Sequence, residues 1–119
     1  ATRLHETLIE KGVYICTQGP RLESAAEIRF YAMIGADIVG MTAMPEAVLA
    51  REAEICYCGI SIITNAAAGI KKEPLTSKEV IETMQKSAER LRSLLQAMFT
   101  SLPQAQKCTC KSALKEAEI

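Results

Sequence analysis

The sequence predicts an α/β protein with a mixed, mainly parallel sheet flanked by helices. Apolar, β-rich runs at residues 13–16, 37–41 and 55–64 alternate with runs of helical periodicity, in the order β-α-β-α-β-α. Alternation of this kind implies right-handed crossovers between parallel strands. The chain is 49% hydrophobic and 24% charged, a composition that suits a globular domain and excludes intrinsic disorder.

The elements of the first half are defined by periodicity, breakers and caps. Residues 1–11 have the pattern of the last turns of a helix, and the Gly-Pro of residues 19–20 ends the first strand. Ser24, followed three residues later by Glu27, forms a capping box. A helix is therefore expected from this point to about Gly35.

The second half is expected to contain two helices around the longest strand. Pro45 is predicted at the first position of a short helix that reaches about Ala53, with Glu46 in the first turn, where a carboxylate suits the helix dipole. The Thr-x-x-Glu of residues 76–79 is a second capping box, and it precedes a long run of helical periodicity. That helix should end just before Pro103, because proline disfavours helix at its predecessor.

Charge and hydropathy exclude several classes of partner. The 14 basic and 14 acidic residues balance, and the aromatic residues are only two Phe and three Tyr, so neither a nucleic-acid footprint nor a base-stacking platform is present. No apolar run approaches the roughly 20 residues that span a bilayer, and no signal peptide opens the chain. A cytoplasmic protein without nucleic-acid or membrane partners is expected.

Five cysteines, an odd number without a signal peptide, also favour a reducing cytoplasm. Cys56 and Cys58 alternate within a predicted strand, so both are expected on one sheet face as small buried hydrophobes. Cys108 and Cys110 lie in a polar tail and can be interpreted as a metal half-site, a redox pair or a strained disulfide. No second Cys/His pair has zinc-ligand spacing, so no metal is expected.

Three polar segments follow the predicted strands, at residues 18–23, 41–46 and 64–65. Ligands of open α/β sheets bind beyond the carboxyl ends of the strands, where these segments should lie. Together they offer two carboxylates, a hydroxyl, a carboxamide and two apolar side chains: Glu23, Glu46, Thr42, Asn65, Met41 and Leu22. This set suits a flat, polar heterocycle attached to a sugar.

Each of these residues also has a purely structural interpretation. Glu23 can serve the dipole of the following helix, and Thr42 can form a turn or cap. Asn65 can close a turn, because asparagine tolerates left-handed backbone, and Met41 can belong to the core. His5 is expected to be a surface or packing residue.

The same segments carry a family resemblance. Its motifs are G-V-Y at 12–14, G-P-x-x-E-x-x-A-E from 19, G-A-D at 35–37, V-G-M-T-x-x-P-E-x-x-x-A-R from 39, and I-T-N at 63–65. The chain resembles the C-terminal half of the purine nucleoside phosphorylase and methylthioadenosine phosphorylase family over about residues 10 to 100. The resemblance implies a nucleoside phosphorylase-like half-domain at residues 1–103, followed by a polar tail at 104–119. T-Q-G-P-R-L-E and M-P-E-A are closest to the methylthioinosine and 6-oxopurine branch.

The resemblance implies phosphorolysis of a purine nucleoside to base and sugar 1-phosphate, with phosphate as co-substrate and no other cofactor. In the family's arrangement Glu23 would hold the purine N1–H edge, and Asn65 would be catalytic, bonding N7 and the 6-oxo group as the base leaves. Met41 would lie under the ribose, and Thr42 would contact phosphate. An Asn at this place, where adenosine-type members carry Asp, favours 6-oxopurines. A homo-oligomer, trimeric or hexameric, is also implied.

Two departures bear on the substrate. Leu22 replaces the Phe that many members place beside the base, and Ser77 stands where 6-oxopurine members place a His near the sugar 5′ position, which suits a 5′-methylthio group. The family's N-terminal half, with its glycine-rich phosphate loop, an Arg and a His, is not among these residues. The chain alone is therefore expected to be inactive, and an N-terminal half could be supplied separately.

Three other readings stay open at this point. The chain can belong to a methylthioadenosine phosphorylase, or it can be a non-catalytic binding or assembly module that retains the fold. A redox module built on Cys108 and Cys110 lacks the C-x-x-C that usually tunes thiols. The resemblance also associates this C-x-C ending with disulfide chemistry in thermophilic archaeal members.

Overall fold

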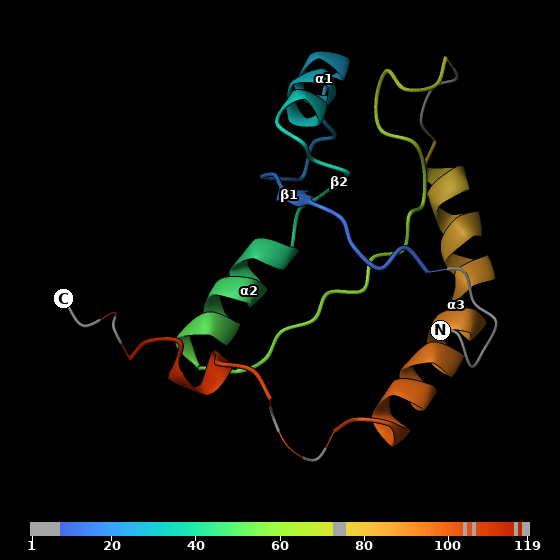
Figure 1. Ribbon diagram of the computed structural model, residues 1–119. Helices are drawn as coiled ribbons and strands as arrows, with labels where there is room; N and C mark the ends of the chain where they lie inside the picture. Colours follow the sequence, from blue (N-terminus) through green and yellow to red (C-terminus); the bar gives the residue numbers. More distant parts are fainter. Residues whose placement is uncertain (1–7, 73–75, 104, 106, 116, 118–119) are drawn as a thin grey trace.

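The computed structural model describes residues 8–72, 76–103, 105, 107–115 and 117. Along these residues the elements are β1 (Tyr14–Cys16), α1 (Ala25–Met33), β2 (Ile38–Gly40), α2 (Ala43–Glu52), α3 (Ser77–Thr100) and the 3₁₀ helix η2 (Cys110–Ser112). Figure 1 shows α1 above the β1–β2 pair and α2 below it, with α3 at the right of the view, apart from these four elements. The predicted α/β class is confirmed. No described helix is long and apolar enough to span a membrane.

β1 and β2 pair in parallel, as the β-α-β pattern predicts. Tyr14 lies opposite Ile38, and α1 is the crossover between the two strands. The pairing continues past the strand ends, because the amide of Thr17 donates to the carbonyl of Gly40 at 2.8 Å. At the other end the carboxylate of Asp37 accepts from the amide of Val13 at 2.7 Å. These bonds extend the pairing by one residue at each end of the two strands, and the first of them joins their carboxyl ends.

The predicted capping box at the start of α1 is confirmed. Ser24 Oγ accepts from the amide of Glu27 at 3.3 Å, and Glu27 Oε2 accepts from the amide of Ser24 at 2.8 Å. The guanidinium of Arg21 adds two bonds to the same carboxylate, at 3.0 and 2.5 Å. These charge-assisted bonds, that of Arg21 first, lower the pKa of Glu27 to about 2.

This shift predicts a pH dependence of the free energy of unfolding. Because the folded-state pKa of Glu27 is lowered from 4.5 to about 2, its contribution is fully present above pH 4.5 and is lost as the pH falls through about 2. We expect Glu27→Gln to flatten the dependence of stability on pH in this window. Urea unfolding of the full chain at several pH values measures the effect. If the variant shows the same dependence of unfolding free energy on pH, protonation of Glu27 is not coupled to unfolding.

α2 differs from the prediction at its start. Its N-cap is Thr42 and its first residue is Ala43, so Pro45 is the third helical residue and not the first. The third residue of a helix also has no intrahelical acceptor for its amide, which is why proline is tolerated there. Glu46 lies in the first turn, as predicted, and the helix ends at Glu52.

The strand predicted at residues 55–64 is not formed. This segment runs without ladder hydrogen bonds from the end of α2 toward the loop at 65–70 (Figure 1). Its apolar side chains have strand propensity, but a strand requires a neighbour that completes its ladder, and the described residues place none beside it. Cys56 and Cys58 are consequently exposed, so their predicted burial in a sheet is also wrong.

The ends of the predicted helices are otherwise close to expectation. α3 runs from Ser77 to Thr100, and Thr76 Oγ1 accepts from the amide of Glu79 at 3.3 Å. Only the bond from the Glu79 amide to Thr76 is therefore seen of the second capping box among the described residues. The carboxylate of Glu79 instead lies 3.7 Å from Lys71 Nζ. Of the helix expected at residues 1–11, residues 1–7 lie outside the described residues and 8–11 are not helical.

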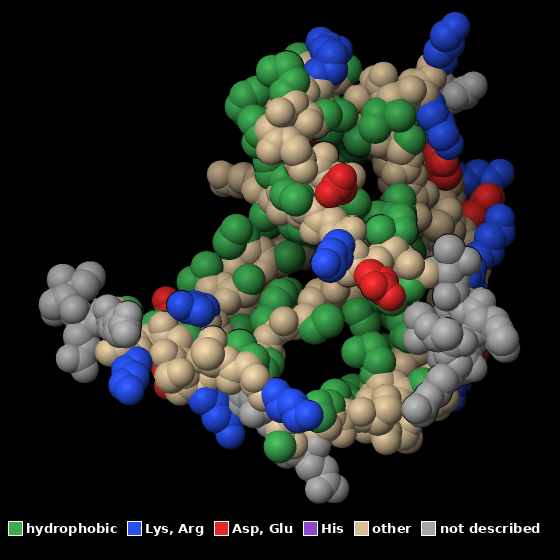
Figure 2. Space-filling view, viewed as in Figure 1, with side chains coloured by type: hydrophobic (Ala, Val, Ile, Leu, Met, Phe, Trp, Pro, Cys, Tyr) green, Lys and Arg blue, Asp and Glu red, His purple; other side chains and the backbone are tan. Residues whose placement is uncertain are grey.

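The described residues do not enclose a core. Ile28 is their one buried hydrophobic residue, at 9% exposure, and large apolar side chains such as Leu49 and Phe99 are 63% and 72% exposed. The radius of gyration is 17.1 Å, against about 13.5 Å for a compact chain of this length. Figure 2 shows openings through the molecule that are edged by hydrophobic side chains. The apolar faces of these elements therefore lack the partners that a complete core would supply.

Candidate functional site

A pocket of about 250 Å³ opens at the carboxyl end of β1. Its wall is formed by the end of β1 at Cys16 and Thr17, by Arg21 and Glu23 in the loop before α1, and by Tyr31 of α1. The carboxyl ends of parallel strands are where open α/β sheets bind ligands. This pocket therefore lies where the first of the three polar segments was predicted to form part of a site, and its role in binding stays a prediction.

Glu23 is held in this pocket by a residue that sequence analysis did not assign a role. Thr17 Oγ1 donates to Glu23 Oε1 at 2.5 Å, and both side chains are half-buried. The same hydroxyl lies 3.4 Å from the carbonyl of Gly40, at the end of β2. Thr17 therefore orients the carboxylate against both strands. Its place directly after β1, within the T-Q-G-P-R-L-E motif, was the available signal.

The second polar segment lies against the first. A Cβ atom added to Gly19 would lie 2.7 Å from Met41 Sδ, so the thioether covers the backbone of this glycine. Met41 is half-buried, and Thr42 is exposed with no side-chain bond to its own helix. Met41 therefore lies beside the loop that leads from β1 to Glu23, and Thr42 follows it as the N-cap of α2.

Asn65 is part-buried but lies outside the residues that line the pocket. Its Oδ1 accepts from Thr64 Oγ1 at 2.5 Å, and its Nδ2 donates to the carbonyl of Ala66 at 3.0 Å. The loop that carries it approaches the start of α1, since a Cβ atom on Gly69 would lie 2.6 Å from Ala25 Cβ. This local bonding agrees with the turn interpretation, and a ligand would have to exchange it for bonds of its own.

The other candidate side chains are not among the residues that line this pocket. Leu22 is 61% exposed, and Ser77 is exposed as the first residue of α3. Glu46 Oε2 accepts from the hydroxyl of Tyr57 at 3.0 Å, and this bond raises the pKa of Tyr57. Glu46 is therefore bound to the segment that follows α2.

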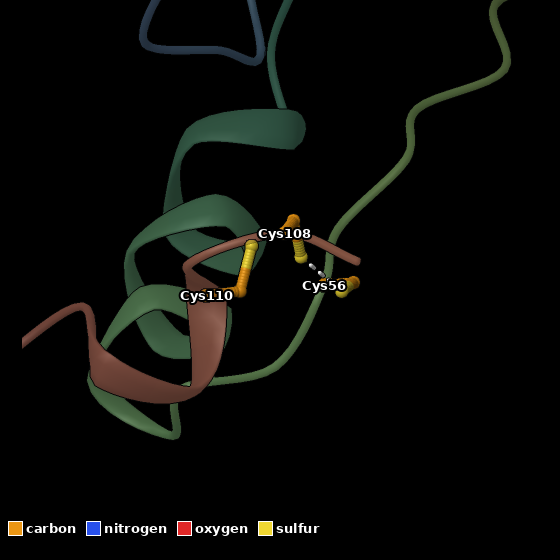
Figure 3. Close-up of side chains that lie close together, drawn as sticks. All are labelled: Cys56, Cys108 and Cys110. Carbon is orange, nitrogen blue, oxygen red and sulfur yellow. Dashed lines mark hydrogen bonds between the residues drawn. The ribbon is translucent and has the colours of Figure 1, made fainter. Parts of the chain in front are cut away.

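The five cysteines are arranged differently from the prediction. Cys108 and Cys110 are not joined by a disulfide, and the side chain of Cys56 lies beside both (Figure 3). Cys108 Sγ lies 3.2 Å from Cys56 Sγ. Hydrogen bonding of the Cys110 thiol to the sulfur atoms of Cys108 and Cys56 favours its protonated form and raises the pKa of Cys110 to about 11. Sequence spacing had missed this third thiol, which comes from a segment 52 residues away.

The chain is thus an α/β protein whose paired parallel strands end at a pocket lined by the carboxylate of Glu23 and the hydroxyl of Thr17, the place where open α/β sheets bind ligands. Comparison with known proteins gives the family. The model of the phosphorylase superfamily matches residues 1–100. The chain belongs to the phosphorylase superfamily, which confirms the resemblance seen in its motifs.

Three relatives illustrate the similarity. The chain is 54% identical to a probable S-methyl-5′-thioinosine phosphorylase of Thermodesulfovibrio yellowstonii over 119 residues, which is all of this chain and 45% of the relative. It is 51% identical to the 6-oxopurine nucleoside phosphorylase of Pyrococcus furiosus over 90% of its length and 40% of the relative. An S-methyl-5′-thioadenosine phosphorylase of Nitrosopumilus maritimus is 46% identical over 89% and 40%. The chain thus spans less than half the length of these relatives.

Proposed function

We propose that this chain is the nucleoside-binding part of a purine nucleoside phosphorylase that cleaves 6-oxopurine nucleosides or 5′-methylthioinosine with phosphate. One observation carries the proposal: Glu23 is oriented by Thr17 at the carboxyl ends of two parallel strands, within the motifs of the phosphorylase superfamily. The names of the first two relatives support the substrate class.

The chemistry follows from where charge develops. In the transition state the sugar becomes positive and electron density moves to the purine, so groups that bind the departing base act on the barrier itself. Glu23 accepts a hydrogen bond from the purine N1–H. The hydroxyl of Thr17, which donates to Glu23 Oε1, keeps the carboxylate oriented for this bond. Asn65 exchanges its local bond to Ala66 for donation to N7. Met41 packs under the ribose, and Thr42 contacts phosphate.

Phosphate requires groups beyond these residues. Thr42 is a single neutral donor, and Arg21, the cation in the pocket wall, is paired with Glu27 at 2.5 Å. A dianion is held against water by several charge-assisted bonds. The proposal therefore includes a further part of a longer enzyme, which supplies the phosphate ligands and covers the exposed apolar faces. It also includes a cytoplasmic homo-oligomer, trimeric or hexameric, and no cofactor beyond phosphate as co-substrate.

A methylthioadenosine phosphorylase is the second candidate, because the Nitrosopumilus maritimus relative carries that name. Asn65 argues for the 6-oxopurine substrates, since a carboxamide can donate to N7 and also meet a 6-oxo group. Side-by-side turnover of inosine, methylthioinosine and methylthioadenosine separates the two candidates.

A chimera tests the proposal directly. This chain replaces the 119 residues that it matches in the Thermodesulfovibrio yellowstonii relative, which leaves the rest of that protein in place. We expect the chimera to release hypoxanthine from inosine or methylthioinosine in the presence of phosphate, and the 119-residue chain alone to release none. A folded chimera without phosphate-dependent turnover of any of the three nucleosides, or turnover by the chain alone, would contradict the proposal.

A further inference from the structure

The segment after η2 is held against the end of α2 by polar bonds that do not involve the cysteines. Arg51 Nη2 donates to the carbonyl of Ala113 at 3.1 Å, and the amide of Leu114 donates to Glu54 Oε1 at 3.2 Å. These bonds join residues 60 or more positions apart. η2 is consequently docked at a defined place beside the C-terminal end of α2 (Figure 1).

The turn that ends α2 directs Cys56 to the same place. Glu54 has a φ of +55°, and the amides of Ile55 and Glu54 bond back to Ala50 and Arg51 at 2.8 and 3.1 Å. This is a Schellman motif with a non-glycine residue in the left-handed position, a conformation that non-glycine residues seldom adopt. The chain therefore reverses at Glu54 and brings Cys56 to face the tail.

The three thiols converge as a result. The Sγ atoms of Cys56, Cys108 and Cys110 all lie within 4.8 Å of one another, and those of Cys56 and Cys108 are 3.2 Å apart. Figure 3 shows the three side chains gathered between η2 and the chain after α2. Three thiolates around one zinc ion, with Zn–S bonds of about 2.3 Å, have sulfur atoms about 3.8 Å apart. The 3.2 Å between Cys56 and Cys108 lies below that value, and the 4.8 Å limit for all three pairs lies above it.

We propose that Cys56, Cys108 and Cys110 form a zinc-binding site that fastens the C-terminal tail to the end of α2. Thiolates are soft ligands that select zinc over harder cations. A disulfide joins two of the three sulfur atoms and leaves the third unused, whereas one metal ion uses all three. Cys56 and Cys108 are exposed, so a water molecule can occupy the fourth, tetrahedral position.

Binding is a proton exchange without any redox change. Each of the three thiols loses its proton to the buffer as its sulfur forms a bond to Zn²⁺, so three protons leave for each ion bound. Lys107 and Lys111 flank the pair of tail cysteines in the sequence, and their charges offset the excess negative charge of three thiolates on a divalent ion. The site is independent of the proposed catalytic function, because it lies apart from the pocket at β1.

The test uses the full chain, purified reduced and metal-free under anaerobic conditions. ZnCl₂ is added in one equivalent, and cysteines are alkylated and located by peptide mass. We expect all five cysteines to react without zinc and only Cys16 and Cys58 to react with it. CoCl₂ in place of ZnCl₂ should give the visible bands of tetrahedral cobalt together with sulfur-to-cobalt charge transfer.

Serine variants distinguish a specific zinc site from nonspecific protection of cysteines by zinc. Cys56→Ser, Cys108→Ser and Cys110→Ser should each weaken zinc binding more than about 100-fold, since the loss of a group that only orients a ligand already costs about 10- to 100-fold. Cys58→Ser is the matched control, two residues from Cys56 but outside the cluster, and it should bind zinc normally. The inference is overturned if zinc protects no cysteine, if protection survives all three serine variants, or if Cys58→Ser abolishes it.

Discussion

Replacing Asn65 with aspartate is expected to lower kcat/KM for 6-oxopurine nucleosides about 5- to 150-fold in the active chimera. The carboxylate is an acceptor only, so it faces the 6-oxo group with a second acceptor and leaves N7 without a donor. A lost buried hydrogen bond costs about 1–3 kcal/mol, which corresponds to this range. A 6-amino substrate gains an acceptor for its N–H, so its kcat/KM should fall less or rise. The ratio of methylthioinosine to methylthioadenosine turnover is the quantity to measure.

Asn65→Ala is the matched control for this change. Alanine removes both the donor and the acceptor, so it should slow both nucleosides and shift their ratio much less than aspartate does. If aspartate leaves the ratio unchanged in a folded enzyme, Asn65 does not read the base, and its bonds to Thr64 and Ala66 are its whole role.

Substituting alanine for Gly69 is expected to destabilise the protein by about 2–5 kcal/mol. Gly69 has a φ of +79°, and a Cβ atom there would lie 2.6 Å from Ala25 Cβ and 3.4 Å from Ala25 Cα. Left-handed backbone costs a non-glycine residue about 1–2 kcal/mol, and overpacking adds about 1–3 kcal/mol. The side chain cannot swing away, because the contact is with the first residue of α1.

Two further glycines separate the two contributions. Gly35 has a φ of +87° with nothing within 4 Å of an added Cβ, so Gly35→Ala should cost only the backbone term of about 1–2 kcal/mol. Gly59 has neither feature, and Gly59→Ala should change stability by less than about 1 kcal/mol. Urea unfolding of the three variants gives the order. Equal effects at positions 35 and 69 would show that the loop does not pack on α1.

The elements that sequence analysis predicted well are those whose determinants are local. The capping box depends on Ser24 and Glu27, three positions apart, and the strands at 14–16 and 38–40 could find each other because only α1 separates them in the chain. The strand predicted at 55–64 failed for the opposite reason. Its own residues favour extended backbone, but a strand exists only where another segment completes its hydrogen bonds.

The candidate site shows the same division. Glu23, Met41 and Thr42 could be predicted from their places after the strands, because the carboxyl ends of parallel strands meet at one edge. The bond from Thr17 to Glu23 and the contact of Met41 with Gly19 required the fold, since each depends on the path of the chain between segments. Motif spacing carries no information about that path.

The sequence by itself determined the family, the α/β class and the starts of α1 and α3, because recurring motifs and caps act over short stretches of chain. Only the tertiary structure decided which distant groups meet. The left-handed turn at Glu54 and the bond from Arg51 to Ala113 bring Cys56 to Cys108 and Cys110. The physical reason is that such contacts depend on the directions of turns and on packing between elements, which residue spacing does not encode.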